Sequence, residues 1–151
     1  MIVMLWKKVL QLNIHIPKIY LFHCATSYDQ EELLKSYSPQ AGEIKVVSLP
    51  CSGKLDILYL TKAFDTGADG AAILICKEGE CHYMEGNMRA RKRVQAVDEL
   101  LEEAGLGKGR TKIIQMGDKG ITGAVHELED FLLQIKIIVE NAPSLPTSKT
   151  E

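Results

Sequence analysis

Long apolar runs are missing from this chain of 151 residues. No stretch approaches the roughly 18 consecutive apolar residues that a membrane-spanning helix needs, so we expect no membrane span. The apolar segment Met1–Trp6 precedes Lys7 and Lys8, whereas a secretory signal places its charges before its apolar region. The sequence therefore predicts an intracellular, cytoplasmic protein.

A strong charge of one sign is also absent. The chain has 18 basic and 20 acidic residues, and its formal net charge is −2. This balance does not indicate binding to nucleic acid or to a membrane surface. The basic run Arg89–Arg93 is local, and no aromatic residues accompany it as a surface on which bases could stack. We therefore expect no nucleic-acid partner.

Several sequence motifs of enzymes are absent as well. No predicted strand is followed by Gly-x-x-x-x-Gly-Lys-Ser/Thr or Gly-x-Gly-x-x-Gly, the glycine-rich loops that bind phosphates. No Cys-x-x-Cys pair indicates a thiol–disulfide enzyme. No nucleophile, base and orienting group stand out as a set, so the sequence predicts no catalytic residues.

The order of the apolar segments indicates the fold. Short β-rich runs alternate with segments of helical spacing, and this alternation is typical of a parallel sheet covered by helices on both faces. The residue types of helix N-caps occur at the predicted helix starts. The predicted strands are residues 18–23, 43–49, 70–75 and 112–115, and the predicted caps are Ser27, Ser52–Gly53, Asn87 and Thr122.

This pattern predicts an α/β fold. We expect a single flavodoxin-like domain over residues 18–140, with a four-stranded, mostly parallel sheet and helices on both faces. Residues 1–17 lie outside the pattern and form an N-terminal extension. Residues 141–151 are rich in Pro, Ser, Thr and Lys, which predicts a disordered tail.

Cysteine is scarce, but its four copies are placed alike. Cys24, Cys51 and Cys76 each follow one of the first three predicted strands, and Cys81 lies in the loop after the third. The carboxyl ends of parallel strands lie at one edge of a sheet, where ligands bind, so we expect all four cysteines at that edge. Four thiolates that converge from loops most readily form a metal or iron–sulfur site.

Two other interpretations of the four cysteines stay open from the residues alone. Buried free cysteine is common as a small apolar residue. Four cysteines also suit tetrahedral zinc, although the two short Cys-x2–4-Cys knuckles of many zinc sites are missing. His82 directly follows Cys81, and in a metal site it is expected to pack on the site or to donate a hydrogen bond to a sulfur rather than to bind the metal.

Three segments of the chain carry a more specific pattern. They read Pro-Cys-Ser-Gly-Lys-Leu-Asp from Pro50, Lys-Ala-Phe from Lys62 with Gly-Ala-Asp-Gly from Gly67, and Gly-Glu-Cys-His-Tyr-Met-Glu-Gly-Asn from Gly79. In these segments the chain resembles the delta subunit of methyl-viologen-reducing hydrogenase. The resemblance runs from about residue 18 to about residue 116, and its Cys-His-Tyr-x-Glu-Gly-Asn segment is highly specific.

The resemblance implies a small iron–sulfur subunit, whose 2Fe–2S cluster would be held by Cys24, Cys51, Cys76 and Cys81. It also implies a non-catalytic relay that passes electrons between a hydrogenase or formate dehydrogenase module and the flavin-bearing subunit of heterodisulfide reductase. The alternative is a zinc-bound or cofactor-free interaction module of the same complex that has lost its cluster.

The chain departs from the family pattern at two positions beside the cysteines. The family has a Cys-x-x-Cys pair after the first strand, where this chain reads Cys24-Ala-Thr-Ser27. Ser27 therefore lies beside the expected cluster, and it also suits a helix cap. Ile75 stands where the family tends to have glycine before Cys76. The four remaining cysteines are the number that a 2Fe–2S cluster needs.

A basic helix face is expected directly after the cysteine loop. Arg89, Lys92 and Arg93 recur at spacings of three and four, which places them on one side of a helix. Such a face is commonly no more than a solvated surface. Its position beside the cysteines predicts that it docks an acidic partner.

Overall fold

The computed structural model describes residues 2–4, 15–25, 29–37, 42–77, 79–81 and 85–141 of the chain. Strands and helices alternate along the sequence. The strands are β1 (Lys18–Cys24), β2 (Glu43–Leu49), β3 (Gly70–Ile75) and β4 (Thr111–Gln115). The helices are α2 (Gln30–Ser36), α3 (Ile57–Asp65), α4 (Gly86–Glu103) and α5 (Gly120–Asn141), and a 3-10 turn, η1 (Ser52–Lys54), precedes α3.

The strands form one sheet in the order β2-β1-β3-β4, and every neighbouring pair is parallel. The predicted α/β fold is confirmed, and the sheet is wholly rather than mostly parallel. The narrower prediction of a flavodoxin-like fold stays a prediction, because the described residues form four strands and the fold of that name has five.

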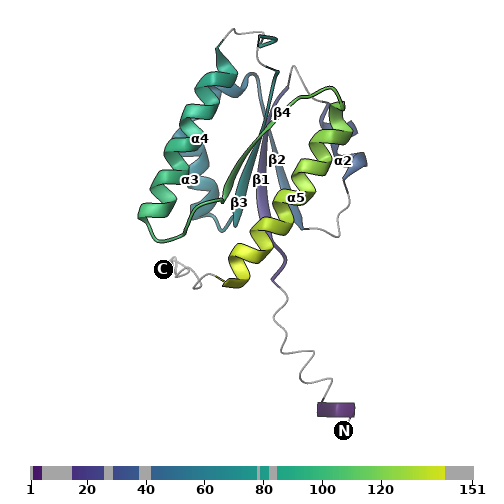
Figure 1. Ribbon diagram of the computed structural model, residues 1–151, viewed down its shortest axis with the longest axis vertical. Coiled ribbons are helices and arrows are strands. Elements are labelled where there is room, and N and C mark those ends of the chain that lie inside the picture. The colour runs from purple at the N-terminus through teal and green to yellow at the C-terminus, as the bar shows by residue number, and fades with distance from the viewer. Residues whose placement is uncertain are drawn as a thin grey trace.

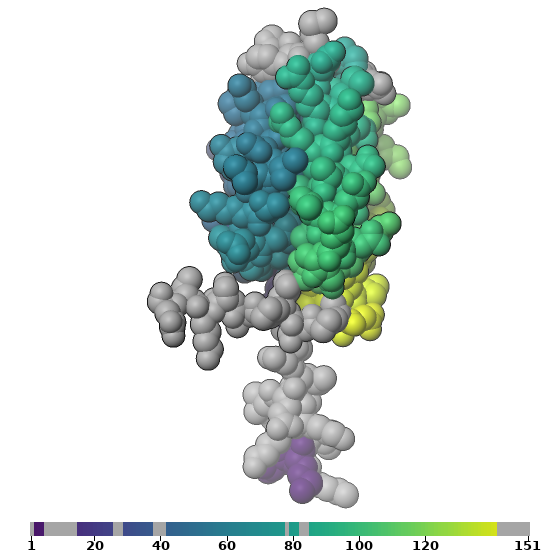
Figure 2. Space-filling view, turned by 90° about the vertical axis from the view of Figure 1, so that its left-hand side faces the viewer, coloured from purple at the N-terminus to yellow at the C-terminus, as the bar shows by residue number. Residues whose placement is uncertain are grey.

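Helices cover both faces of the sheet, as predicted (Figure 1). Side chains that alternate along β1 enter two separate cores: Leu21 packs with α2 and α5, and Phe22 packs with α3 and α4. Figure 2 shows α3 and α4 side by side over their face. Strand β3 is buried along its whole length, which explains its continuous apolar sequence.

Two helices begin with a different cap from the predicted one. The carboxylate of Asp29 accepts a hydrogen bond from the Glu31 amide at the start of α2, whereas the predicted cap, Ser27, lies outside the described residues. Asp56 caps α3 through the Leu58 amide, because Ser52 and Gly53 fold into η1 instead.

The predicted caps of the last two helices are also wrong. Helix α4 begins at Gly86, so Asn87 lies inside it, and the buried Asn87 amide donates to the carbonyls of Cys76 and Lys77 at 3.5 and 3.4 Å. Helix α5 begins at Gly120, two residues before Thr122. In both places the helix therefore begins before the residue whose type predicts the cap.

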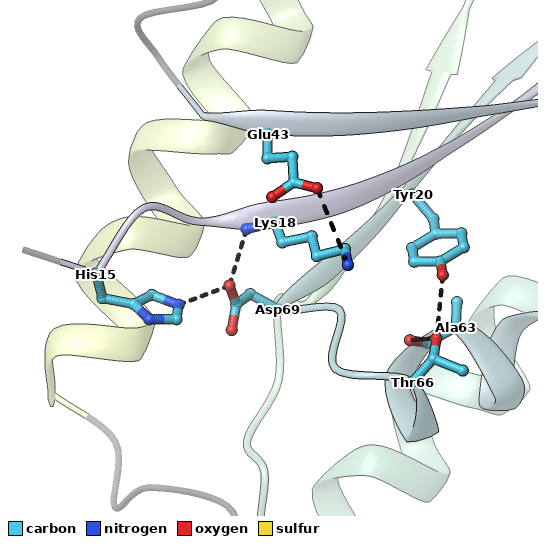
Figure 3. Close-up of polar contacts among 7 residues, drawn as sticks. All are labelled: His15, Lys18, Tyr20, Glu43, Ala63, Thr66 and Asp69. Atoms are coloured by element: carbon cyan, nitrogen blue, oxygen red, sulfur yellow. Dashed lines mark hydrogen bonds and ion pairs between the residues drawn. The ribbon is translucent and has the colours of Figure 1, made fainter.

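The segment just before β1 is tied to the amino-terminal edge of the sheet (Figure 3). One carboxylate oxygen of Asp69 accepts a hydrogen bond from the Lys18 amide at 2.8 Å and contacts the His15 imidazole at 2.7 Å. The Pro17 carbonyl accepts from the Glu43 amide. The part of the predicted N-terminal extension next to β1 therefore joins the domain.

At the other end of the chain, α5 continues to Asn141. The predicted disordered tail otherwise falls on residues 142–151, which lie outside the described residues. Across the part of the chain that the structure describes, no helix is both long enough and apolar enough to cross a membrane.

Candidate metal centre

The structure brings the four cysteines together at the carboxyl edge of the sheet. Cys24 is the last residue of β1, Cys51 lies between β2 and η1, Cys76 follows β3, and Cys81 lies between β3 and α4. Their side chains form one cluster and are 1%, 4%, 3% and 9% exposed, respectively. Residues separated by up to 57 positions thus meet in one buried group of sulfur atoms.

The sheet topology explains why the group forms at this position. The chain leaves β1 toward β2 on one side and later returns across β1 to β3 on the other. Helices α2 and α4, which follow β1 and β3, consequently cover opposite faces. The connection that leaves β1 and the connection that leaves β3 separate at the point between these two strands. Open α/β sheets bind ligands at such a point. Cys24 and Cys76 lie on either side of that point.

Two glycines let η1 and the start of α4 approach the sulfur atoms closely. A Cβ atom added at Gly86 would overlap the sulfur of Cys51 and lie 3.2 Å from that of Cys81. A Cβ atom added at Gly53 would lie 2.7 Å from the Cα of Gly86. The first residue of α4 and the turn after β2 are therefore packed backbone against backbone beside the cysteines.

Burial raises the pKa of the Cys51 thiol, and negative charge on Cys81 or Cys24 would raise it further. The Gly53 amide donates a hydrogen bond to the Cys51 sulfur at 3.3 Å and opposes this rise in pKa. Thiolates so close together repel one another, so a bound cation would favour ionisation of the whole group.

The chemistry of the donors fits a sulfur-ligated metal or cluster. All four cysteines carry thiols and form no disulfide with one another, and four sulfur donors suit iron–sulfur clusters and tetrahedral zinc. Within the described residues, however, no group of three or more His, Cys, Asp or Glu side chains is arranged to hold a metal ion as it stands. The ligand role of the cysteines therefore stays a prediction.

Two residues predicted to adjoin the ligands, Ser27 and His82, lie outside the described residues. His23, which precedes Cys24 in β1, is buried. Both of its ring nitrogens and the Ser52 hydroxyl lack a hydrogen-bond partner in the described part of the chain.

The three basic residues predicted to dock a partner have different surroundings. Arg89 and Lys92 are exposed, and Arg89 pairs with Glu85 at 3.7 Å. Arg93 is half-buried, and one of its guanidinium nitrogens, Nη1, donates to the carbonyls of Gly53 and Leu55 at 2.6 and 2.5 Å. Sequence spacing groups the three residues, but it gives no signal that Arg93 turns toward η1.

An open cleft of about 480 Å³ leads from the surface to the cysteine cluster. It lies between the turn after β2 and the start of α4, and Cys51 forms part of its wall. Its lining residues are Pro50, Cys51, Gly53, Lys54, Glu85, Gly86 and Arg89. The cysteines are thus buried but close to the molecular surface.

Comparison with known proteins gives the family. The family described as "Methyl-viologen-reducing hydrogenase, delta subunit" matches residues 19–138 of the chain. A vhu iron-sulfur subunit of the F420-non-reducing hydrogenase of Methanocaldococcus jannaschii is 40% identical over 89 residues, which are 56% of this chain and 66% of that protein. The match thus spans slightly less than two thirds of that relative's length.

Two further relatives extend the comparison. The corresponding vhu iron-sulfur subunit of Methanococcus maripaludis is 37% identical over 119 residues, 76% of this chain and 89% of that protein. One subunit of the ferredoxin:CoB-CoM heterodisulfide reductase of Methanosarcina mazei is 32% identical over 94 residues, 58% of this chain but only 12% of that protein. From the family match, which covers all four strands almost completely, the chain belongs to the methyl-viologen-reducing hydrogenase delta subunit family.

Proposed function

We propose that the protein is an electron-transfer subunit that carries a 2Fe–2S cluster on Cys24, Cys51, Cys76 and Cys81. The observation that supports this most directly is the convergence of all four sulfur atoms in one buried group. A bound cluster of this type would accept and release single electrons. Four cysteines satisfy its ligand requirement without Ser27.

The chain's own residues would serve this role in three ways. The cysteines supply four sulfur donors from three strand ends and one loop. The Gly53 amide donates a hydrogen bond to the Cys51 sulfur, and such bonds influence the potential of a sulfur-ligated centre. The cleft beside Cys51 leaves little protein between the sulfur atoms and a docked partner.

The proposed partners are a hydrogenase or formate dehydrogenase module on one side and the flavin-bearing subunit of heterodisulfide reductase on the other. The relatives named as hydrogenase subunits support the first. The match to one segment of a longer heterodisulfide reductase chain supports the second, because a domain like this one is covalently part of that protein. We propose a cytoplasmic setting, since clustered cysteines of this kind must stay reduced.

For docking, we propose a surface made of Arg89 and Lys92 beside the cleft at Cys51. Both side chains are exposed and lie on α4 directly after the cysteine loop. An acidic partner surface held there would be close to the cysteines. Arg93 is not part of this surface in our proposal, because its guanidinium is bound to η1 and Leu55.

Metal and sulfide analysis of the full chain, purified without oxygen, tests the proposed cofactor. We expect a brown protein with about two iron and two sulfide per chain, the composition of a 2Fe–2S cluster. Cys51→Ala should abolish the visible absorption, because it removes one of the four ligands. A colourless protein with one zinc per chain would replace the electron-transfer proposal with a zinc-stabilised interaction module.

A further inference from the structure

We infer that Arg93 is a positioning residue for Cys51: it fixes the turn after β2 against α4 and thereby sets the place of the Cys51 sulfur. The inference rests on the proposed function for its redox consequence. The fixing of the turn by Arg93 involves only residues of this chain and does not depend on a cluster. The interaction joins two segments that are about 40 residues apart, as the separation of Arg93 and Gly53 shows.

The face of α4 that meets η1 is built for close approach. Gly86, Ala90 and Arg93 follow one another at spacings of four and three, so they lie on one side of the helix. Gly86 touches the Gly53 backbone, and Ala90 is fully buried. Gly86 thus lets η1 approach the first turn of α4, and Arg93 follows Gly86 and Ala90 along the same face.

The Arg93 side chain binds both ends of residues 53–55, a segment that begins two positions after Cys51. Its Nη1 atom donates to the Gly53 carbonyl at 2.6 Å and to the Leu55 carbonyl at 2.5 Å. Hydrogen bonds from a charged donor are short and stronger than those between neutral groups. Leu55 is itself fully buried in the core between the sheet and α3 and α4, so the segment is held at one end by packing and along its length by Arg93.

This segment also supplies the hydrogen bond to the Cys51 sulfur. The Gly53 amide donates to that sulfur, while the Gly53 carbonyl accepts from Arg93. Movement of Gly53 away from α4 would therefore lengthen the amide–sulfur bond and open the wall of the cleft at Cys51. Arginine suits this role because its planar guanidinium is always charged, whereas a lysine ammonium is a more mobile point charge.

Alkylation of the cysteines in the metal-free, full-length chain tests the inference without a cluster. The variants are Arg93→Met, which keeps most of the apolar stem, and Arg93→Lys, which keeps the charge. With iodoacetamide as the probe and mass spectrometry to locate the label, Arg93→Met should raise the alkylation rate at Cys51 by at least about tenfold. It removes both charge-assisted hydrogen bonds, and the loss of one alone changes local opening by about that factor. Cys24 and Cys76 should keep their wild-type rates, and Arg93→Lys should fall between.

Arg91→Met is the matched control. It removes the same charge from the same helix, but the Arg91 guanidinium donates to the Gln115 side chain rather than to η1. Its Cys51 rate should equal that of the wild type. A wild-type Cys51 rate in Arg93→Met, or an equal rise at all the cysteines with a lower melting temperature, would overturn the positioning role.

In protein that carries the proposed cluster, the reduction potential provides a second measurement. Both Arg93 variants should shift the potential and the visible circular dichroism, whereas Arg91→Met should leave the dichroism unchanged. If Arg93→Lys matches the wild type in both, Arg93 acts through its charge alone and the positioning role is wrong. Wild-type protein that lacks iron would contradict the proposed function, and the alkylation rates would still decide the role of Arg93.

Discussion

At the scale of single residues, the close packing around the cysteines requires a residue without a side chain at the start of α4. Gly86 is the first residue of α4, and no larger residue fits there without displacing Cys51. Glycine in a helix interior normally makes the helix less stable than alanine does, by about 1 kcal/mol. Because an alanine Cβ atom would overlap the Cys51 sulfur, we expect glycine to be the more stable choice at this position.

We therefore predict that Gly86→Ala lowers the free energy of unfolding by about 1–3 kcal/mol, the usual cost of an added methyl group in a packed core. In protein that carries the proposed cluster, it should also reduce the iron bound per chain, because the added Cβ atom would overlap the Cys51 sulfur. Chemical denaturation and iron analysis measure the two effects.

Gly117→Ala is the control for this prediction, since a Cβ atom at Gly117 would meet nothing within 4 Å. It should leave the free energy of unfolding and the iron content close to the wild-type values. Gly86→Ala protein with wild-type stability and full iron would show that the cysteine loop has room to move.

At the scale of secondary-structure elements, α3 depends on a cap that the sequence pattern does not reveal. The Asp56 carboxylate accepts a hydrogen bond from the Leu58 amide at 3.2 Å. The residues just before it continue from the cysteine turn through η1 and the buried Leu55. The start of α3 thus holds the carboxyl-terminal end of the turn that carries Cys51.

We predict that Asp56→Ala lowers the free energy of unfolding by about 1 kcal/mol, whereas Asp56→Asn has little effect because asparagine is an equally good N-cap. Urea denaturation of the two variants measures the difference. Equal stability of the alanine and asparagine variants would mean that the cap hydrogen bond contributes nothing to α3.

At the scale of the whole molecule, the two edges of the sheet carry different kinds of residues. The amino-terminal edge is closed by Asp69, which holds the segment before β1 (Figure 3). The carboxyl edge carries the cysteines, the cleft and the exposed cations Arg89 and Lys92. A redox partner that docks by charge would therefore recognise the carboxyl edge.

From the proposed function, we predict that the double variant Arg89→Glu/Lys92→Glu slows electron transfer to the proposed flavin-bearing partner. It should leave the absorption spectrum of the proposed cluster unchanged. Charge complementarity acts mainly on the association rate, and salt screens it over about 8 Å at physiological ionic strength. The defect should thus be largest at low salt and shrink as salt is added. Stopped-flow reduction of the partner at several salt concentrations measures it.

The control double variant is Lys62→Glu/Lys108→Glu. It changes the net charge equally, and it alters exposed lysines at the end of α3 and in the connection from α4 to β4, away from the cysteines. Its transfer rate should remain near that of the wild type. Equal slowing by both double variants would indicate an effect of net charge rather than a docking surface at Arg89 and Lys92.

The sequence by itself determined the order of elements, the parallel sheet and the meeting of the cysteines. The spacing of apolar residues and the apolar content of a segment are local properties. They distinguish buried strands from amphipathic helices without knowledge of the fold. The meeting of Cys24, Cys51 and Cys76 follows from topology, because the carboxyl ends of parallel strands must share an edge. Family membership likewise follows from the sequence alone, because the family match depends only on the order of residues along the chain.

Only the tertiary structure decided how the surroundings of the cysteines are built. The Arg93 side chain could have pointed to solvent, as those of Arg89 and Lys92 do, and its spacing in the helix is compatible with either direction. The contact of Gly53 with Gly86 likewise depends on how η1 packs on α4. Such contacts join segments distant in sequence, so their geometry is set by packing of the whole core and has no local signal.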